Sequence, residues 1–269
     1  MKIYNHIHQL SKLIFFSILA LLILLISACA GKPKDNLAPY RNMTEAQIFE
    51  KGEKELKKKH YKQASQIFAA LDALYPFGTY AQQASLDNIY ANYKKGDTAS
   101  GLAETDRYIR LYPRSPQIDY VYYMKGLLSD QPGLSWMQQQ IGIDPAEHDL
   151  SSKKQAFLAF NEVVTRFPTS PYAPNSALRM IQIRNLLAHK QVMLADFYFK
   201  HKAYLAAANR ASYVVHHFQG SPEVIKALAI LIKSYRAAGL DHLADMTFKV
   251  MATSYPNAKE LKDLKNTKP

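Results

Sequence analysis

The stretch ASQIFAALDALYP, residues 64–76, is the part of the sequence that decides the fold. A small residue, Ala64, is followed at +4 by Phe68, at +7 by Leu71 and at +12 by Pro76. Positions three and four residues apart lie on one face of an α-helix, so the first three residues form a stripe that a partner can cover. Proline ends the helix, because it lacks an N–H and clashes with the preceding turn. The stretch therefore predicts one helix that packs closely against another.

The same spacing recurs four more times along the chain. Each set begins with a small residue and ends with proline, except the fourth, which ends with glutamine. The further sets are Gly101, Thr105, Tyr108 and Pro113; Ala156, Phe160, Val163 and Pro168; Ala207, Ala211, Val214 and Gln219; and Ala244, Phe248, Met251 and Pro256. The pattern resembles the second helix of a tetratricopeptide repeat (TPR), and five sets in register favour a TPR-like array over an ordinary helical bundle.

A first helix is expected before each of these second helices. Gly52 and Ala195 stand twelve residues before Ala64 and Ala207, at the position where two helices approach closely. The expected first helices cover residues 44–58, 81–94, 116–130, 190–202 and 222–238.

The spacing between repeats predicts two insertions. The residues that end the second helices lie 37, 55, 51 and 37 residues apart, whereas a TPR unit has about 34 residues. The two long intervals predict an inserted loop around 131–150 and an extra helix near 172–187. The predicted fold class is all-α, a TPR-like superhelical solenoid of about five helix pairs with one inserted loop and one extra helix.

Residues 1–29 have the pattern of a lipoprotein signal peptide. Lys2 and Lys12 precede an apolar run at 13–26, which is shorter than the ~18 residues of a membrane-spanning helix. The run ends in Ile26-Ser-Ala-Cys29, which resembles the lipobox of bacterial lipoproteins, and Cys29 is the only cysteine of the chain. We expect cleavage before Cys29 and a covalent diacylglycerol and N-acyl lipid on it, with no other cofactor and no metal. The alternative is an uncleaved anchor.

These features divide the chain into six segments. They are a signal peptide at 1–28, a lipidated N-terminus and flexible tether at 29–42, repeats 1–2 with the first helix of repeat 3 at 43–131, an inserted loop at 132–150, repeats 3–5 at 151–260, and a polar tail at 261–269. Two or more acyl chains anchor a protein stably. Ala30 follows the cysteine where aspartate would signal retention in the inner membrane. We therefore expect a lipid-anchored protein on the periplasmic face of the outer membrane.

Composition and motifs favour a binding protein over an enzyme. Without Lys2 and Lys12 the chain carries 32 Lys and Arg against 22 Asp and Glu, a net charge of +10, which suits acidic partners or anionic lipid headgroups. Nucleic acid is not an expected partner, since no nucleic-acid-binding spacing occurs. The sequence contains no HExxH, GxSxG, Walker A or GxGxxG motif and no second cysteine for a Cys/His site. We expect no catalytic residues.

Several strings resemble the BamD family, lipoproteins of the outer-membrane β-barrel assembly (BAM) machinery. They are YPFGTYAQQ at 75–83, LDNIYANYK at 86–94, RYIRLYP at 107–113, IDYVYYMKGL at 118–127, GID at 142–144 and ADFYFKHKAYLAAANRA at 195–211. The likeness covers nearly the whole mature chain. Two departures stand out: residues 144–149 read DPAEHD where the family usually has arginines, and the fourth repeat has no closing proline.

The resemblance implies partners and sites. It implies a scaffold that binds a POTRA domain of BamA, the barrel-forming subunit, mainly through its C-terminal repeats, and that contacts BamC and BamE-like lipoproteins. It also implies a groove on the N-terminal repeats for the targeting signal of unfolded outer-membrane proteins, a C-terminal strand that ends in an aromatic carboxylate. The candidates by position are Phe77, Tyr80, Tyr90 and Tyr93 for the groove, and Asn209 and Arg210 for the contact with BamA.

Two other functions remain open at this stage. A pilotin-like TPR lipoprotein for a secretin or pilus would be expected to have regular repeats of about 34 residues, which the long intervals argue against. A peptidoglycan-associated periplasmic factor or enzyme is the other alternative, and the missing acid/base constellation argues against an enzyme.

Overall fold

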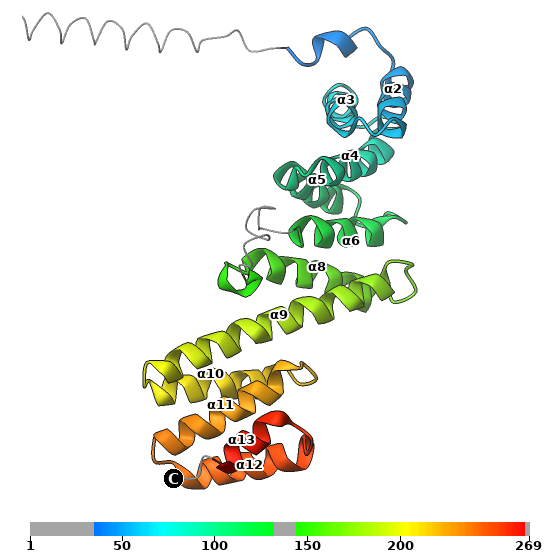
Figure 1. Ribbon diagram of the computed structural model, residues 1–269. Helices are drawn as coiled ribbons and strands as arrows, with labels where there is room; N and C mark the ends of the chain where they lie inside the picture. The colour runs from blue at the N-terminus through cyan, green and yellow to red at the C-terminus, as the bar shows by residue number, and fades with distance from the viewer. Residues whose placement is uncertain (1–34, 132–143, 267–269) are drawn as a thin grey trace, which may run out of the picture. The chain divides into compact units, whose positions relative to one another are not determined.

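The computed structural model describes residues 35–131 and 144–266, and nearly all of these residues form helices or the turns between them (Figure 1). They belong to two units, which divide between Met43 and Thr44. In the first unit a short 3-10 helix, η1 (Ala38–Tyr40), follows Asp35, whose carboxylate accepts the N–H of Leu37 and pairs with Arg41 at 3.0 Å.

The second unit consists of helix pairs followed by a short terminal helix. The pairs are α2 (Glu45–Lys57) with α3 (Tyr61–Leu74), α4 (Ala81–Lys95) with α5 (Thr98–Leu111), α6 (Ile118–Ser129) with α8 (Ser151–Arg166), α9 (Ala173–Lys200) with α10 (Tyr204–His217), and α11 (Glu223–Ala237) with α12 (Asp241–Ser254). The 3-10 helix η2 (Pro145–Glu147) precedes α8, and α13 (Lys259–Asn266) follows α12. Each helix packs mainly against its neighbours in sequence, and contacts between α4 and α6 and between α9 and α11 join successive pairs. The all-α, TPR-like solenoid is therefore confirmed.

Small residues on the first helices allow the close approach of the two helices of a pair that the spacing predicts. Ala64, Phe68 and Leu71 are buried, and the corresponding residues of the next three sets are buried too. A Cβ atom on Gly52 of α2 would stand 2.5 Å from the Phe68 ring, and one on Gly126 of α6 would stand 2.4 Å from the Phe160 ring. A large ring on the second helix thus fits where the first helix has no side chain.

The fourth repeat reaches the same packing with different volumes. Ala195 of α9 and Ala211 of α10 are both fully buried at the positions that Gly52 and Phe68 occupy in the first repeat. Two alanines replace the combination of glycine and phenylalanine, so the methyl group added on the first helix makes up for part of the ring volume that is absent from the second helix.

The second helices end at an aromatic residue, with or without proline. Tyr75, Tyr112, Phe167 and Tyr255 precede proline and share one non-helical C-cap conformation, with φ from −136° to −128° and ψ from 54° to 59°. Phe218 precedes Gln219, yet it adopts a similar φ of −121° and ψ of 35°. Phe218 and Tyr255 pack against one core cluster and Tyr112 and Phe167 against another. Burial of the ring therefore accompanies the end of the helix, and proline is not required.

The expectation of two separate helices around residues 172–202 is wrong. Residues Ala173–Lys200 form one helix, α9, of 28 residues. Between Pro174 and Gly220 the sequence contains neither proline nor glycine. No helix-breaking residue therefore separates the expected extra helix at 172–187 from the expected first helix of repeat 4 at 190–202. The additional residues lengthen the first helix of a pair and do not form an element of their own.

The C-terminal segment is more ordered than a polar tail would be. Residues Lys259–Asn266 form α13, and Leu261 and Leu264 are buried. The helix packs against α11, where the Arg236 guanidinium donates to the Leu264 carbonyl at 3.0 Å. Two leucines three residues apart are enough to bury one side of an otherwise charged helix. Across 35–131 and 144–266, none of the helices has the length and apolarity to cross a membrane.

Candidate functional site

Aromatic rings gather between the first helices of the N-terminal repeats. Phe49 of α2 stacks on Tyr80, the N-cap residue of α4, with ring centroids 4.8 Å apart. Tyr61 at the start of α3 meets Tyr90 of α4 edge to face at 6.2 Å, and the Lys94 ammonium lies 5.8 Å from the Tyr61 ring. We call Phe49, Tyr61, Tyr80 and Tyr90 the N-terminal aromatic face.

Polar groups lie along the same stripe of α4. Gln83, Asp87, Tyr90 and Lys94 follow one another at intervals of three and four residues, so they share one side of the helix. The Gln83 amide donates to both carboxylate oxygens of Asp87, at 3.1 and 3.2 Å. The face therefore alternates rings with hydrogen-bonding groups, which suits an extended peptide with both apolar and polar side chains.

Asp87 is held in an unusual protonation state for an aspartate. Burial raises the pKa of its carboxyl to about 7; the hydrogen bond from Gln83 opposes this rise, and the nearby Glu53 of α2 adds to it. Glu53 in turn lies 3.9 Å from the Lys57 ammonium. At neutral pH Asp87 therefore exists in both forms and can either donate or accept a hydrogen bond.

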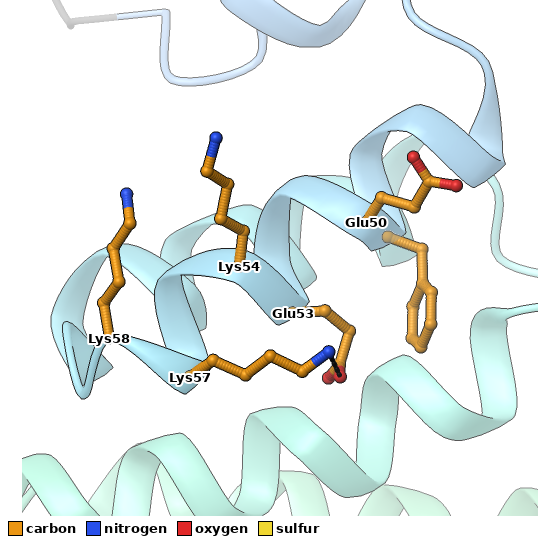
Figure 2. A pocket seen from close by; sticks show the side chains of 6 residues that line it. Glu50, Glu53, Lys54, Lys57 and Lys58 are labelled. Atoms are coloured by element: carbon orange, nitrogen blue, oxygen red, sulfur yellow. Dashed lines mark ion pairs between the residues drawn. The ribbon is translucent and has the colours of Figure 1, made fainter.

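An open cavity of ≈ 550 Å³ runs along α2 beside the aromatic face, and Figure 2 shows its lining. Its walls are formed by Phe49, Glu50, Glu53, Lys54, Lys57 and Lys58. Lys57 points toward Glu53, whereas Lys54 and Lys58 extend from the other side of the helix (Figure 2). The cavity combines an aromatic ring with several ammonium groups, so an anionic group beside an aromatic one would find partners there.

The aromatic lining continues onto the next repeats. Tyr123 of α6 stacks on Tyr172, the N-cap residue of α9, at 5.0 Å, and Tyr120 lies 5.5 Å from the same ring. Burial raises the pKa of the Tyr120 hydroxyl, and the neighbouring Tyr172, Asp87 and Tyr90 raise it further. Tyr120 thus links this second cluster electrostatically to the stripe on α4.

The four residues predicted for the groove differ in position and in exposure. Tyr80 and Tyr90 are on the aromatic face, about 15 Å apart along α4 at 1.5 Å per residue. Phe77 lies in the turn before α4 with 94% of its surface exposed, and no ring contact joins it to any other described residue. Tyr93 is half-buried and packs against the core cluster that contains Ile89 and Leu128. Phe77 is the most accessible of the four.

The pair predicted for the BamA contact lies on the exposed side of α10. Asn209 and Arg210 are both exposed, and the Arg210 guanidinium donates to the Gln191 side chain at 3.3 Å. Leu205 and Tyr213, one turn to either side of Asn209, are 60% and 46% exposed. The pair is therefore part of a mixed apolar and polar surface, of the kind found at protein interfaces.

Two sequence-based expectations fall on residues outside the described ranges. Cys29 is one of them, and residues 132–143 of the inserted loop are the other. The described end of the loop contacts α9: the Asp144 carboxylate lies 2.8 Å from His189 Nε2, and the Lys190 ammonium donates to the Glu147 carbonyl at 3.1 Å. Asp144 and Glu147 thus take part in packing the loop. In 35–131 and 144–266 no group of three or more His, Cys, Asp or Glu residues could hold a metal.

Sequence reasoning did not single out Phe49, Tyr61 or the Glu53–Asp87 pair. Phe49 and Glu53 are four residues apart on α2, and so are Gln83 and Asp87 on α4. Each set was visible as one side of a helix. What the sequence did not show was that these two sides face each other, because that depends on the turn between the repeats.

Comparison with known proteins identifies the family. The model of the YfiO family, described as outer membrane lipoprotein, matches residues 41–251. The outer membrane protein assembly factor BamD of Neisseria meningitidis serogroup B is 32% identical over 241 residues, which cover 89% of this chain and 90% of that protein. The BamD proteins of Vibrio cholerae and Pasteurella multocida are both 33% identical, over 84% and 89% of this chain and 92% and 90% of their own lengths.

The shared name of these relatives describes an assembly factor, which is a scaffolding role and not an enzymatic one. The match includes all of the repeats except the end of the last one. The chain therefore belongs to the BamD family of outer membrane protein assembly factors.

Proposed function

We propose that the chain is anchored to the periplasmic face of the outer membrane by acyl chains on Cys29 and holds unfolded outer-membrane proteins for the β-barrel assembly machinery. The family assignment supports the assembly role, and the lipobox-like sequence before Cys29 supports the anchor. Incorporation of labelled palmitate into the wild-type chain, and its loss in Cys29→Ser, is the expected test result. A wild-type chain without label would contradict the anchor.

The N-terminal aromatic face is the proposed site for the C-terminal signal of the unfolded protein. The observation that carries this proposal is the set of rings on α2, α3 and α4, with ammonium groups beside them and the exposed Phe77 ring in the turn before α4. An aromatic side chain of the signal would pack on these rings, and its terminal carboxylate would pair with a lysine.

Peptide binding tests the aromatic face. We expect Phe77→Ser to weaken binding of a peptide with a C-terminal phenylalanine by about tenfold, in the range of an exposed anchor residue at an interface. Fluorescence anisotropy of the labelled peptide measures the change. Leu178→Ser is the matched control, because Leu178 is 60% exposed on α9, away from this face. Equal loss in both variants, or equal binding of the C-terminally amidated peptide, would contradict the proposal.

The exposed side of α10 is the proposed contact with a POTRA domain of BamA, with BamC and BamE-like lipoproteins as further partners. We expect Arg210→Glu to reduce the BamA copurified from detergent-solubilised outer membrane by about tenfold, since it places a charge of the wrong sign at the interface. Arg114→Glu makes the same charge change in the exposed turn between α5 and α6. If Arg210→Glu retains BamA as well as this control does, Arg210 is not part of the contact.

A further inference from the structure

Lysines are concentrated on the first repeat. From Lys54 to Lys62 the sequence contains five lysines and one glutamate. All five lysines are exposed around the end of α2 and the start of α3. Lys57 pairs with Glu53, and we call the other four, Lys54, Lys58, Lys59 and Lys62, the α2 lysine patch. Figure 2 shows Lys54 and Lys58 on the side of α2 away from Glu53, and both also line the open cavity beside the aromatic face, whereas Lys59 and Lys62 do not.

Most of this charge is not neutralised within the protein. Lys58 pairs with Glu55 at 2.9 Å, but Glu55 also lies 2.7 Å from His60 Nδ1, and these two hydrogen bonds lower the pKa of its carboxyl. No ion pair or hydrogen bond joins the side chain of Lys54, Lys59 or Lys62 to another described residue. The patch therefore presents at least three uncompensated ammonium groups to solvent.

One lysine of the patch occupies a position where glycine is the favoured residue. Lys59 has φ = 62°, and the residues five positions before the small residue in repeats 2 and 5 are Gly96 and Gly239, with φ of 78° and 73°. A side chain in the left-handed region brings Cβ too close to the following carbonyl oxygen and so destabilises the fold. The conformation of Lys59 therefore offers a substitution, Lys59→Gly, that removes its charge without a loss of backbone stability.

The patch lies close in sequence to the proposed lipid anchor. Thr44, the N-cap of α2, is fifteen positions after Cys29, which limits the span between them to about 50 Å. A basic surface tethered at this distance meets the bilayer surface at high effective concentration. We infer that the α2 lysine patch binds the anionic headgroups of the membrane surface and so orients the first repeat on the bilayer. This inference rests on the proposed anchoring at Cys29.

Vesicle binding without the anchor tests the patch. The mature chain, residues 29–269, with Cys29→Ser is mixed with vesicles of phosphatidylcholine alone or with 30% phosphatidylglycerol, and flotation measures the bound fraction. Each lysine near an anionic surface contributes roughly fivefold in affinity, so we expect Lys54→Gln/Lys59→Gln/Lys62→Gln to bind the anionic vesicles about 100-fold more weakly. Binding of the parent chain should also fall in 0.5 M salt.

A control variant separates local charge from net charge. Lys233→Gln/Lys249→Gln/Lys262→Gln removes the same charge from exposed lysines of α11, α12 and α13 and should bind like the parent chain. Equal loss in both triple variants, equal binding to neutral vesicles, or no binding by the parent chain would each overturn the inference. Binding of soluble polyglutamate without binding of vesicles would also overturn it, and would point to an acidic protein partner.

A single substitution excludes unfolding as the reason for lost binding. Lys59→Gly relieves the left-handed strain, so this variant should be at least as stable as the parent chain and still bind anionic vesicles about fivefold more weakly. Unchanged binding by this variant would overturn the role of Lys59. Because the assay uses Cys29→Ser, a failure of acylation appears only in palmitate labelling. Peptide binding by Lys59→Gly, which keeps every lysine that lines the cavity beside Phe49, reports separately on the aromatic face.

Discussion

Lys202 takes up the same backbone position in the fourth repeat as Lys59 does in the first. Its φ is 60°, whereas the equivalent residues Gly96 and Gly239 have the φ values of ordinary glycines in this turn. The turn between the two helices of a pair needs one residue in the left-handed region, and glycine reaches it without a clash between Cβ and the backbone. The two lysines therefore reduce the stability of their repeats.

We expect Lys202→Gly to stabilise the chain by roughly 0.5–1 kcal/mol. Relief of the left-handed penalty of about 1–2 kcal/mol exceeds the ~0.5–1 kcal/mol that glycine loses through its freer unfolded state. Urea unfolding followed by circular dichroism measures the difference. Lys202→Ala removes the same charge but keeps a Cβ, so it should bring no gain; a gain of equal size in Lys202→Ala would show that charge, and not backbone conformation, was responsible.

At the scale of elements, His189 joins three parts of the chain. It lies on α9, with Nε2 2.8 Å from the Asp144 carboxylate before η2 and Nδ1 3.3 Å from Glu223 Oε1 at the start of α11. The Nδ1 contact is close enough for an ion pair but not aligned as a hydrogen bond. Partial burial would lower the pKa of His189, but the two carboxylates outweigh that effect and raise it. When it is protonated, the ring pairs with both carboxylates and so joins the end of the inserted loop and α11 to α9.

The contacts of His189 with the two carboxylates make the free energy of unfolding depend on pH. Because the pKa of His189 is higher in the folded state than its ordinary value of about 6.5, its contribution is complete below that value and is lost as pH rises through the folded-state pKa. We expect His189→Gln to lower the free energy of unfolding by roughly 1 kcal/mol at pH 6 and by much less at pH 9. Urea unfolding of both chains at each pH measures the difference, and a loss that grows with pH would contradict this account.

The helices and their register could be predicted from the sequence, but several contacts between repeats could not. The small residue and the residues at +4 and +7 identify the buried stripe because they depend only on the 3.6-residue period of one helix. The continuity of α9 was not predicted, because the standard repeat length suggested a break between two helices, although the sequence has no helix-breaking residue there. The closeness of Glu53 to Asp87 depends on the angle between two repeats, and no local spacing encodes that angle. Phe77 was predictable as a candidate, but its exposure was not.

Over the whole chain, each pair of helices is supported mainly by the pairs next to it in sequence, so the last pair has support on one side only. The terminal helix α13 covers the other side with Leu264, which is fully buried, and Leu261. Without this cover the apolar side of α11 would meet water. The stability of the C-terminal repeats should therefore depend on α13, whereas the N-terminal repeats should not sense it.

Leu264→Asp tests this separation. Burying an unpaired carboxylate in place of leucine should destabilise the terminal repeat by roughly 3–5 kcal/mol. In hydrogen exchange measured by mass spectrometry, we expect the amides of α11 and α12 to exchange at least tenfold faster while those of α3 to α5 keep their rates. Lys262→Asp places the same charge on the exposed side of α13 and should leave both regions unchanged. Uniformly faster exchange along the chain would show that the repeats unfold together, and the assembly factor could not then loosen its C-terminal repeats while the aromatic face at the other end of the sequence stays folded.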